Sequence, residues 1–280
     1  MKNLYGTIGF TILKNNKTGK KIIIFADKHD SLPSCLNKTD ISTWIKTKID
    51  SSKILLEEVP RNTVNLQELW LGATHTQGLK KIYLENPQQI NGLDIRPLLI
   101  PFSWELISDN EIQYDITIIK YIERINNFFC VKDDYVQLHV KNYQVEKLKR
   151  TKLGKHFLAI KKIFLKILEK NSQFLKFKIK TVKIIKIELL EEINDILDQI
   201  MEWNICANIY QHMTKSIILH AGLAHSEKIV SLLIDYYNYS FLMEQGINKL
   251  SLVTNKNISG CVQLPTDMEM QFGGYANLGF

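Results

Sequence analysis

The feature that most constrains the fold is a regular alternation, over the first hundred residues, of short apolar runs with helical patterns. Residues 21–26 (KIIIFA), 53–56 (KILL) and 90–95 (INGLDI) are short and largely apolar, which is typical of buried strands. Between the first two, residues 40–51 carry apolar side chains at helical spacing. Strands that alternate with helices favour parallel pairing. The sequence therefore predicts an α/β fold with a mixed, largely parallel central sheet flanked by helices.

Further elements complete this predicted core. Residues 4–13 form an apolar run joined to strand 21–26 by a polar turn, which predicts a hairpin. Residues 65–84 are expected to be helical in pieces, broken near Gly72 and Gly78, with His75 in a loop. After the middle of the chain the pattern returns. The remaining predictions are a strand at 215–220, a helix at 226–237 with Ser226 as its N-cap, and a strand at 249–254.

The middle of the chain has a different pattern. Residues 115–213 contain no proline and little glycine, and their apolar residues recur with helical periodicity. The three predicted stripes are Ile116, Ile119, Ile122, Ile125 and Phe129; Phe157, Ile160, Phe164, Ile167 and Leu168; and Leu190, Ile193, Ile196, Leu197 and Ile200. We expect a large all-helical insertion. The predicted organisation is residues 1–112 and 214–258 as the two halves of the α/β core, 113–213 as the insertion, and 259–280 as a Gly-rich C-terminal tail.

The charge composition bears on the class of partner. The 280 residues carry a net charge of +7, and only four of the 36 basic residues are arginines. Specific contacts to bases more often use arginine, so we do not expect a nucleic-acid partner. Richness in lysine, isoleucine and asparagine is the usage of an AT-rich genome. The basic excess is concentrated between Lys147 and Lys186, which is where a polyanion would bind.

The cysteines and the apolar runs bear on the compartment. The four cysteines lie far apart, and without a CxxC pair a structural zinc knuckle is not expected. We expect no secretory signal, because the first residues contain no apolar block before a cleavage site, and we expect no membrane span, because no apolar run is long enough. We therefore expect free thiols in a reducing compartment: the cytoplasm, or the host-cell cytoplasm or virion if the chain is virus-encoded.

Polar residues follow the predicted strands. His29 and Asp30 come shortly after strand 21–26, Glu57 and Glu58 follow strand 53–56, and Asp94 and Arg96 lie at the end of strand 90–95. His220 ends strand 215–220, and His225 follows after a turn through Gly222. The carboxyl ends of parallel strands share one edge of a sheet, and ligands bind outside that edge. These side chains are therefore expected to meet.

Imidazole and carboxylate groups together suit a divalent metal such as zinc, manganese or cobalt. We expect His29, Glu57 and His225 to be the ligands, and the metal to activate a water for hydrolysis. Glu58, Asp30 or Asp94 would act as the base or as an orienting carboxylate. Arg96 and His220 would contact the substrate.

Each residue also has a structural interpretation. Asp94 could bond nearby backbone N–H groups, Arg96 could pair with Asp94, and one of the two glutamates could belong to a solvated turn. His220 and His225 could cap the following helix. What favours function is that acid and imidazole groups recur at the same end of successive strands.

Four segments resemble the TIKI/TraB, ChaN and erythromycin-esterase superfamily. Residues 26–33 (ADKHDSLP) resemble its first Gly-x-x-His motif, with Ala26 in place of the glycine, and residues 221–225 (AGLAH) resemble the second. Residues 55–61 (LLEEVPR) and 92–96 (GLDIR) are similar to its acidic segments. The resemblance implies an α/β core with a helical insertion, and metal-dependent hydrolysis that rests on His29, Glu57 and His225.

Three functions follow from these observations. The first is a metal-dependent hydrolase acting on an ester or peptide bond of a small-molecule or peptide substrate. The second is a non-catalytic, virus- or pathogen-encoded effector on the same scaffold, with the helical insertion as its surface for a protein partner. The third is a polyanion-binding protein that uses the stretch from Lys147 to Lys186, whose binding would depend steeply on salt.

Overall fold

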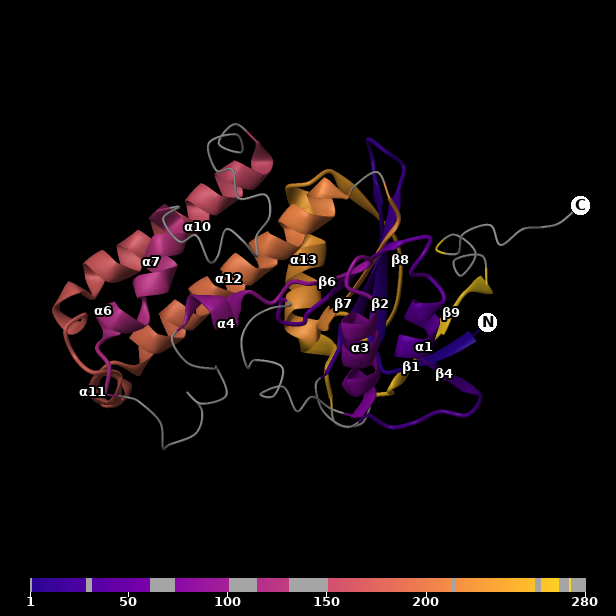
Figure 1. The fold of residues 1–280 in the computed structure, drawn as a ribbon, viewed down its shortest axis with the longest axis horizontal. Helices are drawn as coiled ribbons and strands as arrows, with labels where there is room; N and C mark the ends of the chain where they lie inside the picture. The colour runs from indigo at the N-terminus through magenta and orange to yellow at the C-terminus, as the bar shows by residue number, and fades with distance from the viewer. Residues whose placement is uncertain are drawn as a thin grey trace, which may run out of the picture. The chain divides into compact units, whose positions relative to one another are not determined.

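A computed structural model describes most of the chain (Figure 1). The described residues are 2–28, 32–60, 74–100, 115–130, 151–212, 215–254, 258–266 and 272. They form two compact units. The sheet unit comprises residues 1–58, 70–93 and 205–280, and the helical unit comprises residues 59–69 and 94–204. Predicted site residues His29 and Asp30, and the predicted helix before Thr74, lie outside the described residues.

A six-stranded sheet forms the centre of the sheet unit, with the strand order β6-β5-β7-β3-β2-β8. Its strands are β2 (Gly9–Asn15), β3 (Lys21–Asp27), β5 (Lys53–Leu56), β6 (Ile90–Gly92), β7 (Ile217–Gly222) and β8 (Tyr239–Gly246). Strands β6, β5, β7 and β3 run parallel, and β2 is antiparallel to both β3 and β8. The predicted α/β fold with a largely parallel sheet is confirmed.

Two strand predictions need correction. The hairpin of β2 and β3 is confirmed, but the run 4–13 is broken at Gly6, whose φ of 100° interrupts an extended strand. The predicted strand at 249–254 is wrong, because a 3-10 turn, η2 (Leu250–Leu252), lies there. Strand β8 was not predicted. It is an edge strand with most of its side chains exposed, so it lacks the apolar run that identifies a buried strand.

A second sheet of three strands has the order β4-β1-β9. Its strands are β1 (Lys2–Tyr5), β4 (Lys38–Asp40) and β9 (Cys261–Leu264). Because β1 pairs with both neighbours, it brings Cys35 and Cys261 together, and they form a disulfide across a sequence separation of 226 residues. The expectation of free thiols is wrong for this pair, and disulfides persist in oxidising compartments. Cys130 and Cys206 are not part of a disulfide.

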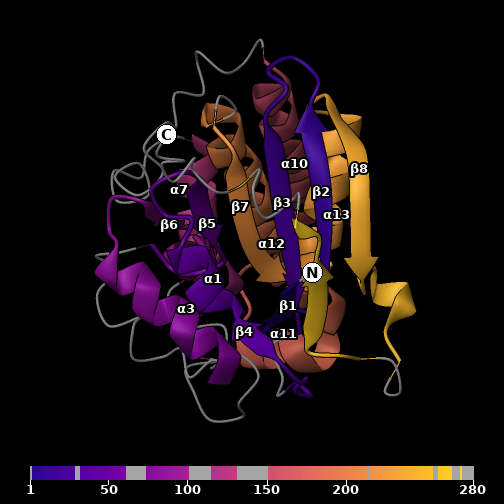
Figure 2. The same ribbon diagram turned by 90° about the vertical axis from the view of Figure 1, so that its right-hand side faces the viewer.

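Helices cover both faces of the six-stranded sheet (Figure 2). Helices α1 (Ile41–Lys46) and α3 (Thr74–Glu85) share a hydrophobic core with one face, in which Trp44 is fully buried. Helix α13 (Leu223–Asp235) packs on the other face. The apolar side chains that form these helices at i, i+3 and i+4 spacing are the ones buried against the sheet.

Three helix predictions in this unit are wrong. Helix α3 runs through Gly78, whose lack of a side chain permits close packing, since a Cβ there would lie 2.5 Å from the Ser42 hydroxyl oxygen. His75 consequently lies in a helix and not in a loop. Helix α13 begins at Leu223 with Gly222 as its N-cap, so Ser226 lies inside the first turn and donates its hydroxyl to the Ala221 carbonyl.

The helical unit confirms the helical periodicity of the middle of the chain. Its helices are α4 (Arg96–Leu99), α6 (Ile118–Tyr121), α7 (Glu123–Cys130), α10 (Lys152–Lys170), the 3-10 turn η1 (Ser172–Phe174), α11 (Ile179–Ile185) and α12 (Ile187–Gln211), of which residues 205–211 belong to the sheet unit. Phe128, Phe157 and Trp203 form its aromatic core. Ile119, predicted to be buried, is 53% exposed. None of the helices in the described part of the chain combines the length and apolarity needed to cross a bilayer.

Candidate functional site

The carboxyl ends of the parallel strands gather polar residues in the sheet unit. In the strand register, Asp27 at the end of β3 lies beside Gly222 at the end of β7. Leu56 at the end of β5 lies beside His220 on the other side of β7. Glu57 continues this pairing, since its backbone N–H donates to the His220 carbonyl at 3.0 Å. The register therefore brings residues from three distant segments to one edge of the sheet.

Glu57 points towards the N-terminus of helix α13. Its Oε2 accepts a hydrogen bond of 2.6 Å from the backbone N–H of Gly222, which is 165 residues away in sequence. Its Oε1 lies 3.7 Å from Nε2 of His225, in the first turn of the helix. The carboxylate is buried, with Glu57 6% exposed, and lies at the positive end of the helix. The structure thus brings together two of the three predicted metal ligands.

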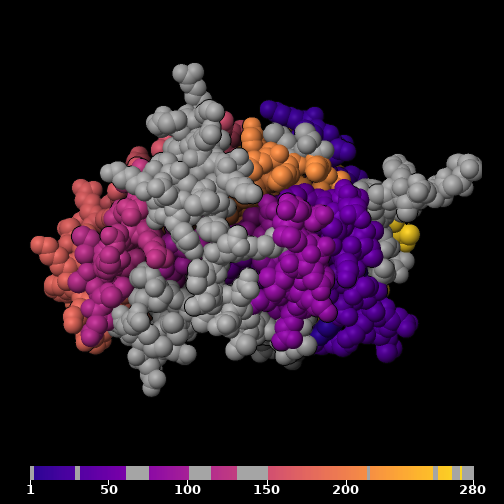
Figure 3. Space-filling model, in the orientation of Figure 1, coloured from indigo at the N-terminus to yellow at the C-terminus, as the bar shows by residue number. Residues whose placement is uncertain are grey.

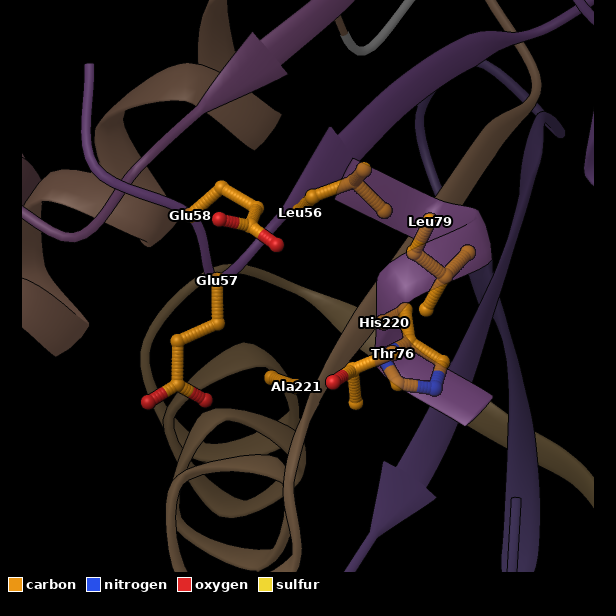
Figure 4. A pocket seen from close by; sticks show the side chains of 7 residues that line it. All are labelled: Leu56, Glu57, Glu58, Thr76, Leu79, His220 and Ala221. Atoms are coloured by element: carbon orange, nitrogen blue, oxygen red, sulfur yellow. The ribbon is translucent and has the colours of Figure 1, made fainter. Parts of the chain in front are cut away.

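Glu58 points to the other face of the sheet (Figure 4). Successive residues of an extended chain project to opposite sides, so Glu57 faces α13 while Glu58 follows Leu56 towards α3. On that side, a cavity of about 20 Å³ is lined by Leu56, Glu57, Glu58, Thr76, Leu79, His220 and Ala221. This is room for a single water molecule. Glu58 is 7% exposed, so neither glutamate belongs to a solvated turn.

The His220 ring contacts the backbone near the N-terminus of the chain. The ring is buried, and Nε2 lies 3.2 Å from the backbone carbonyl oxygen of Gly6. A carbonyl oxygen only accepts, so Nε2 carries the proton in this hydrogen bond. In the neutral ring the lone pair is then on Nδ1. His220 lies within β7 beside Thr76 and does not cap the following helix.

The described residues on either side of His29 and Asp30 lie next to helix α13. Asp27 pairs in register with Gly222, and Leu32 lies in the same hydrophobic cluster as Leu223. Residues 33–35 are anchored, because the backbone N–H of Gly260 donates to the Pro33 carbonyl at 3.2 Å and Cys35 forms the disulfide. His29 and Asp30 themselves lie outside the described residues.

Asp94 and Arg96 belong to the helical unit, where they form a salt-bridge network. Arg96 donates from Nε and Nη2 to the two carboxylate oxygens of Asp94, at 2.9 and 3.0 Å. Its Nη1 donates to Asp198 at 2.8 Å. The guanidinium is therefore held by two carboxylates, which agrees with the structural interpretation of Arg96. Contact of Arg96 with a substrate stays a prediction.

Two site residues were not selected from the sequence. Asp27 is 1% exposed at the end of β3, although the two residues chosen in that segment were His29 and Asp30. The observation that could have identified it is its place as the first acidic residue after the run 21–26. Thr76 lines the cavity from helix α3, and nothing in the sequence connects it to this sheet edge.

The donor set fits part of a metal site. Ligand atoms around one zinc ion lie about 2.0–2.2 Å from it and hence about 3–4 Å apart, which matches the 3.7 Å between Glu57 and His225. The hydrogen bond from Gly222 would orient Glu57 as outer-shell contacts orient ligands. Within the described ranges there is no group of three His, Cys, Asp or Glu residues that could hold an ion. A third ligand would have to come from another part of the chain.

Comparison of the chain with family models, with curated proteins and with solved structures finds no match.

Proposed function

We propose that the sheet unit carries a metal-dependent hydrolytic site at the carboxyl ends of β5 and β7. The observation that supports this proposal is the pairing of Glu57 with His225, from segments far apart in sequence, at 3.7 Å. Both side chains lie at the sheet edge where open α/β sheets bind ligands. The superfamily resemblance of residues 26–33 and 221–225 points to the same location.

His29 is the proposed third ligand. The described positions on either side of it, Asp27 and Leu32, lie beside Gly222 and in the cluster of Leu223. Because both flanking positions are next to the first turn of α13, His29 is close enough in sequence to supply a ligand there. With His29, the site would have two imidazoles and one carboxylate, a ligand set that zinc and manganese accept.

A bound divalent ion would supply an activated water for attack on an ester or peptide carbonyl. The residues of the chain have separate tasks in this proposal. Glu57 is held by the Gly222 N–H, so its orientation does not depend on the ion. His225 keeps 13% of its side chain exposed, which makes the α13 side the approach for a substrate. Glu58 and His220 line a cavity with room for one water, and they would act there as proton acceptors.

Metal titration tests the ligands directly. The full chain should bind zinc, manganese or cobalt in isothermal titration calorimetry, with about one ion per chain. Replacing Glu57→Gln or His225→Ala should weaken binding at least tenfold, in the range found when metal-site residues are lost. His212→Ala, at a histidine remote from the pair, is the matched control and should bind as the unchanged protein does. Equal binding by all four proteins would overturn the proposal.

Hydrolysis is tested separately from binding. A panel of aryl esters and short peptides should be cleaved by the metal-loaded protein, and cleavage should stop with chelator and return with the ion. His29→Ala should bind the ion more weakly and lose turnover. Metal binding without turnover of any ester or peptide would remove the hydrolase and leave a metal-binding protein.

A non-catalytic effector on the same scaffold is the second candidate. The observation that favours it is that a carboxylate accepting from the N-cap residue of a helix stabilises that helix without any ligand. In that case Glu57 and His225 are structural. The biological effect of the protein would then persist in a His29→Ala, His225→Ala double variant that remains folded.

A further inference from the structure

A second surface, in the helical unit, points to a function separate from the sheet-edge site. Residues 176–187 (KFKIKTVKIIKI), named the basic tip here, contain five lysines and no acidic residue. They follow α10, include helix α11 and end at the first residue of α12. Four large apolar side chains of the basic tip are exposed: Ile184 by 85%, Ile185 by 51%, Ile187 by 46% and Phe177 by 42%. Apolar residues this exposed and this close together mark interaction sites.

The exposure of these side chains is fixed by the way the tip is anchored. Ile179 and Val182 form the buried side of α11, so the opposite side of this short helix, including Ile184, faces outward. The residues before the helix pair with the segment that leads into α6. The Ile179 N–H donates to the Ile116 carbonyl at 2.9 Å, and the Ile118 N–H donates to the Phe177 carbonyl at 3.0 Å. Helix α11 lies at the lower left of the helical unit in the ribbon view (Figure 1), and coral atoms of this part of the chain form the left edge of the space-filling view (Figure 3).

The acidic residues near the tip neutralise only part of its charge. Asp115 pairs with both Lys178 and Lys180, and Glu188 pairs with Lys186 at 3.3 Å. Among the described residues, these two carboxylates pair with three lysines of the tip, so the ion pairs leave a positive charge there. Lys176 is exposed next to Phe177. Charge and apolar surface therefore occur on the same twelve residues.

We propose that the basic tip binds the surface of an anionic lipid bilayer, with its isoleucines at the acyl boundary and its lysines among the headgroups. Adjacent exposed aliphatic and lysine side chains are the composition of interfacial membrane segments. Lysines that attract anionic lipid contribute about fivefold each to binding. A nucleic-acid surface would instead use arginines and stacking aromatics, and the tip has no arginine and one phenylalanine.

Vesicle cosedimentation of the full chain tests the proposal. The protein should pellet with vesicles that contain about 30 mol% phosphatidylserine in phosphatidylcholine and stay in solution with phosphatidylcholine alone. Binding should weaken at high salt, because exposed charges are screened. Ile184→Ser should weaken binding about tenfold through the loss of apolar contact. The pair Lys176→Gln and Lys180→Gln should weaken it roughly twentyfold.

Matched controls come from the same chain. Leu36 is 87% exposed, close to the value of Ile184, so Leu36→Ser removes equal apolar exposure elsewhere and should leave binding unchanged. Lys20→Gln with Lys228→Gln is the corresponding charge control, since both lysines are exposed. Absence of binding to the anionic vesicles overturns the proposal. So does equal binding by Ile184→Ser and Leu36→Ser, and so does binding to duplex DNA or RNA without binding to vesicles.

Discussion

Glu57 and Glu58 are consecutive, equally buried acids, yet they contact different parts of the sheet unit. The Glu57 carboxylate accepts from the N-cap of α13 and faces His225. The Glu58 side chain points to the other face, where both glutamates, His220 and Thr76 line a small cavity beneath α3. Alternation along an extended chain accounts for the difference. The polar residues at this sheet edge therefore form one group on each face, instead of the single cluster that the strand ends predict.

The two faces therefore differ in what they could do, although the residues that form them are adjacent in sequence. The α13 side has the proposed ligand pair, partial exposure of His225, and the described residues Asp27 and Leu32 on either side of His29. The α3 side has buried carboxyl and imidazole groups around space for one water. Replacing Glu57 should perturb only the α13 side, and replacing Gly92 should perturb only the α3 side.

The largest effect is expected from removing the disulfide. A Cys35→Ser, Cys261→Ser double variant should lose about 4 kcal/mol of unfolding free energy, because the bond closes a very long loop. The disulfide also anchors Cys35, which follows the proposed ligand His29 closely in sequence, so the affinity for the metal should fall as well. Urea denaturation measures the unfolding free energy, and calorimetric titration measures the metal affinity. Cys130→Ser, at a free cysteine, is the control, and a double variant as stable as this control would contradict the prediction.

Glu57→Ala should cost about 2 kcal/mol, the value of a charge-assisted hydrogen bond whose buried donor is left without its acceptor. The sharper measurement is hydrogen exchange at the Gly222 amide. Its protection should fall in Glu57→Ala and persist in Glu58→Ala, since only Glu57 accepts from that N–H. Equal loss of protection in both variants would mean that the two acids are not separate.

Gly92→Ala should perturb the α3 side alone. A Cβ at this position would lie 2.6 Å from the Glu58 carbonyl oxygen and 2.4 Å from the Tyr83 hydroxyl, so the backbone at Glu58 must shift. We expect a loss of about 1.5 kcal/mol in urea denaturation, typical of overpacking. Metal affinity at Glu57 and His225 should stay within twofold, roughly 0.4 kcal/mol. A larger loss of affinity would show that the two sides are coupled.

The smallest effect is expected at His212, which has lysines nearby and has no part in either proposed group at the sheet edge. Burial, with Lys53 and Lys215 nearby, lowers the pKa of His212 below its ordinary value of 6.5. Its contribution to stability is present above pH 6.5 and is lost as the pH falls, because the unfolded chain then binds the proton more readily. The variant His212→Gln should show a weaker pH dependence of the urea unfolding midpoint between about pH 5 and 7. A profile identical to that of the unchanged protein would contradict this assignment.

Much of the sheet unit could be predicted from the sequence. Strands β3, β5 and β7 are buried on both faces and so appear as continuous apolar runs, and their order implies that Glu57 and Gly222 share an edge. Strand β8 could not be predicted this way, because an edge strand does not need apolar side chains on both faces. The separation of Glu57 from Glu58 was available from strand periodicity, whereas the Cys35–Cys261 pairing depends on the tertiary position of β1.

In the helical unit, periodicity predicted the helices but not which apolar residues stay outside. Phe157, Ile160 and Phe164 are buried as expected, while Ile119 and Ile184 are exposed. Helical spacing locates an apolar stripe, but isoleucines occur on more than one side of the basic tip. Only the contacts of α11 with its neighbours determine which of them faces outward.

The Cys35–Cys261 bond closes a covalent ring of the residues between the two cysteines, and this ring contains the whole helical unit. A single protease cut anywhere between these cysteines opens the backbone without releasing a fragment. The nicked protein should therefore migrate as one species on a non-reducing gel and as two pieces after reduction.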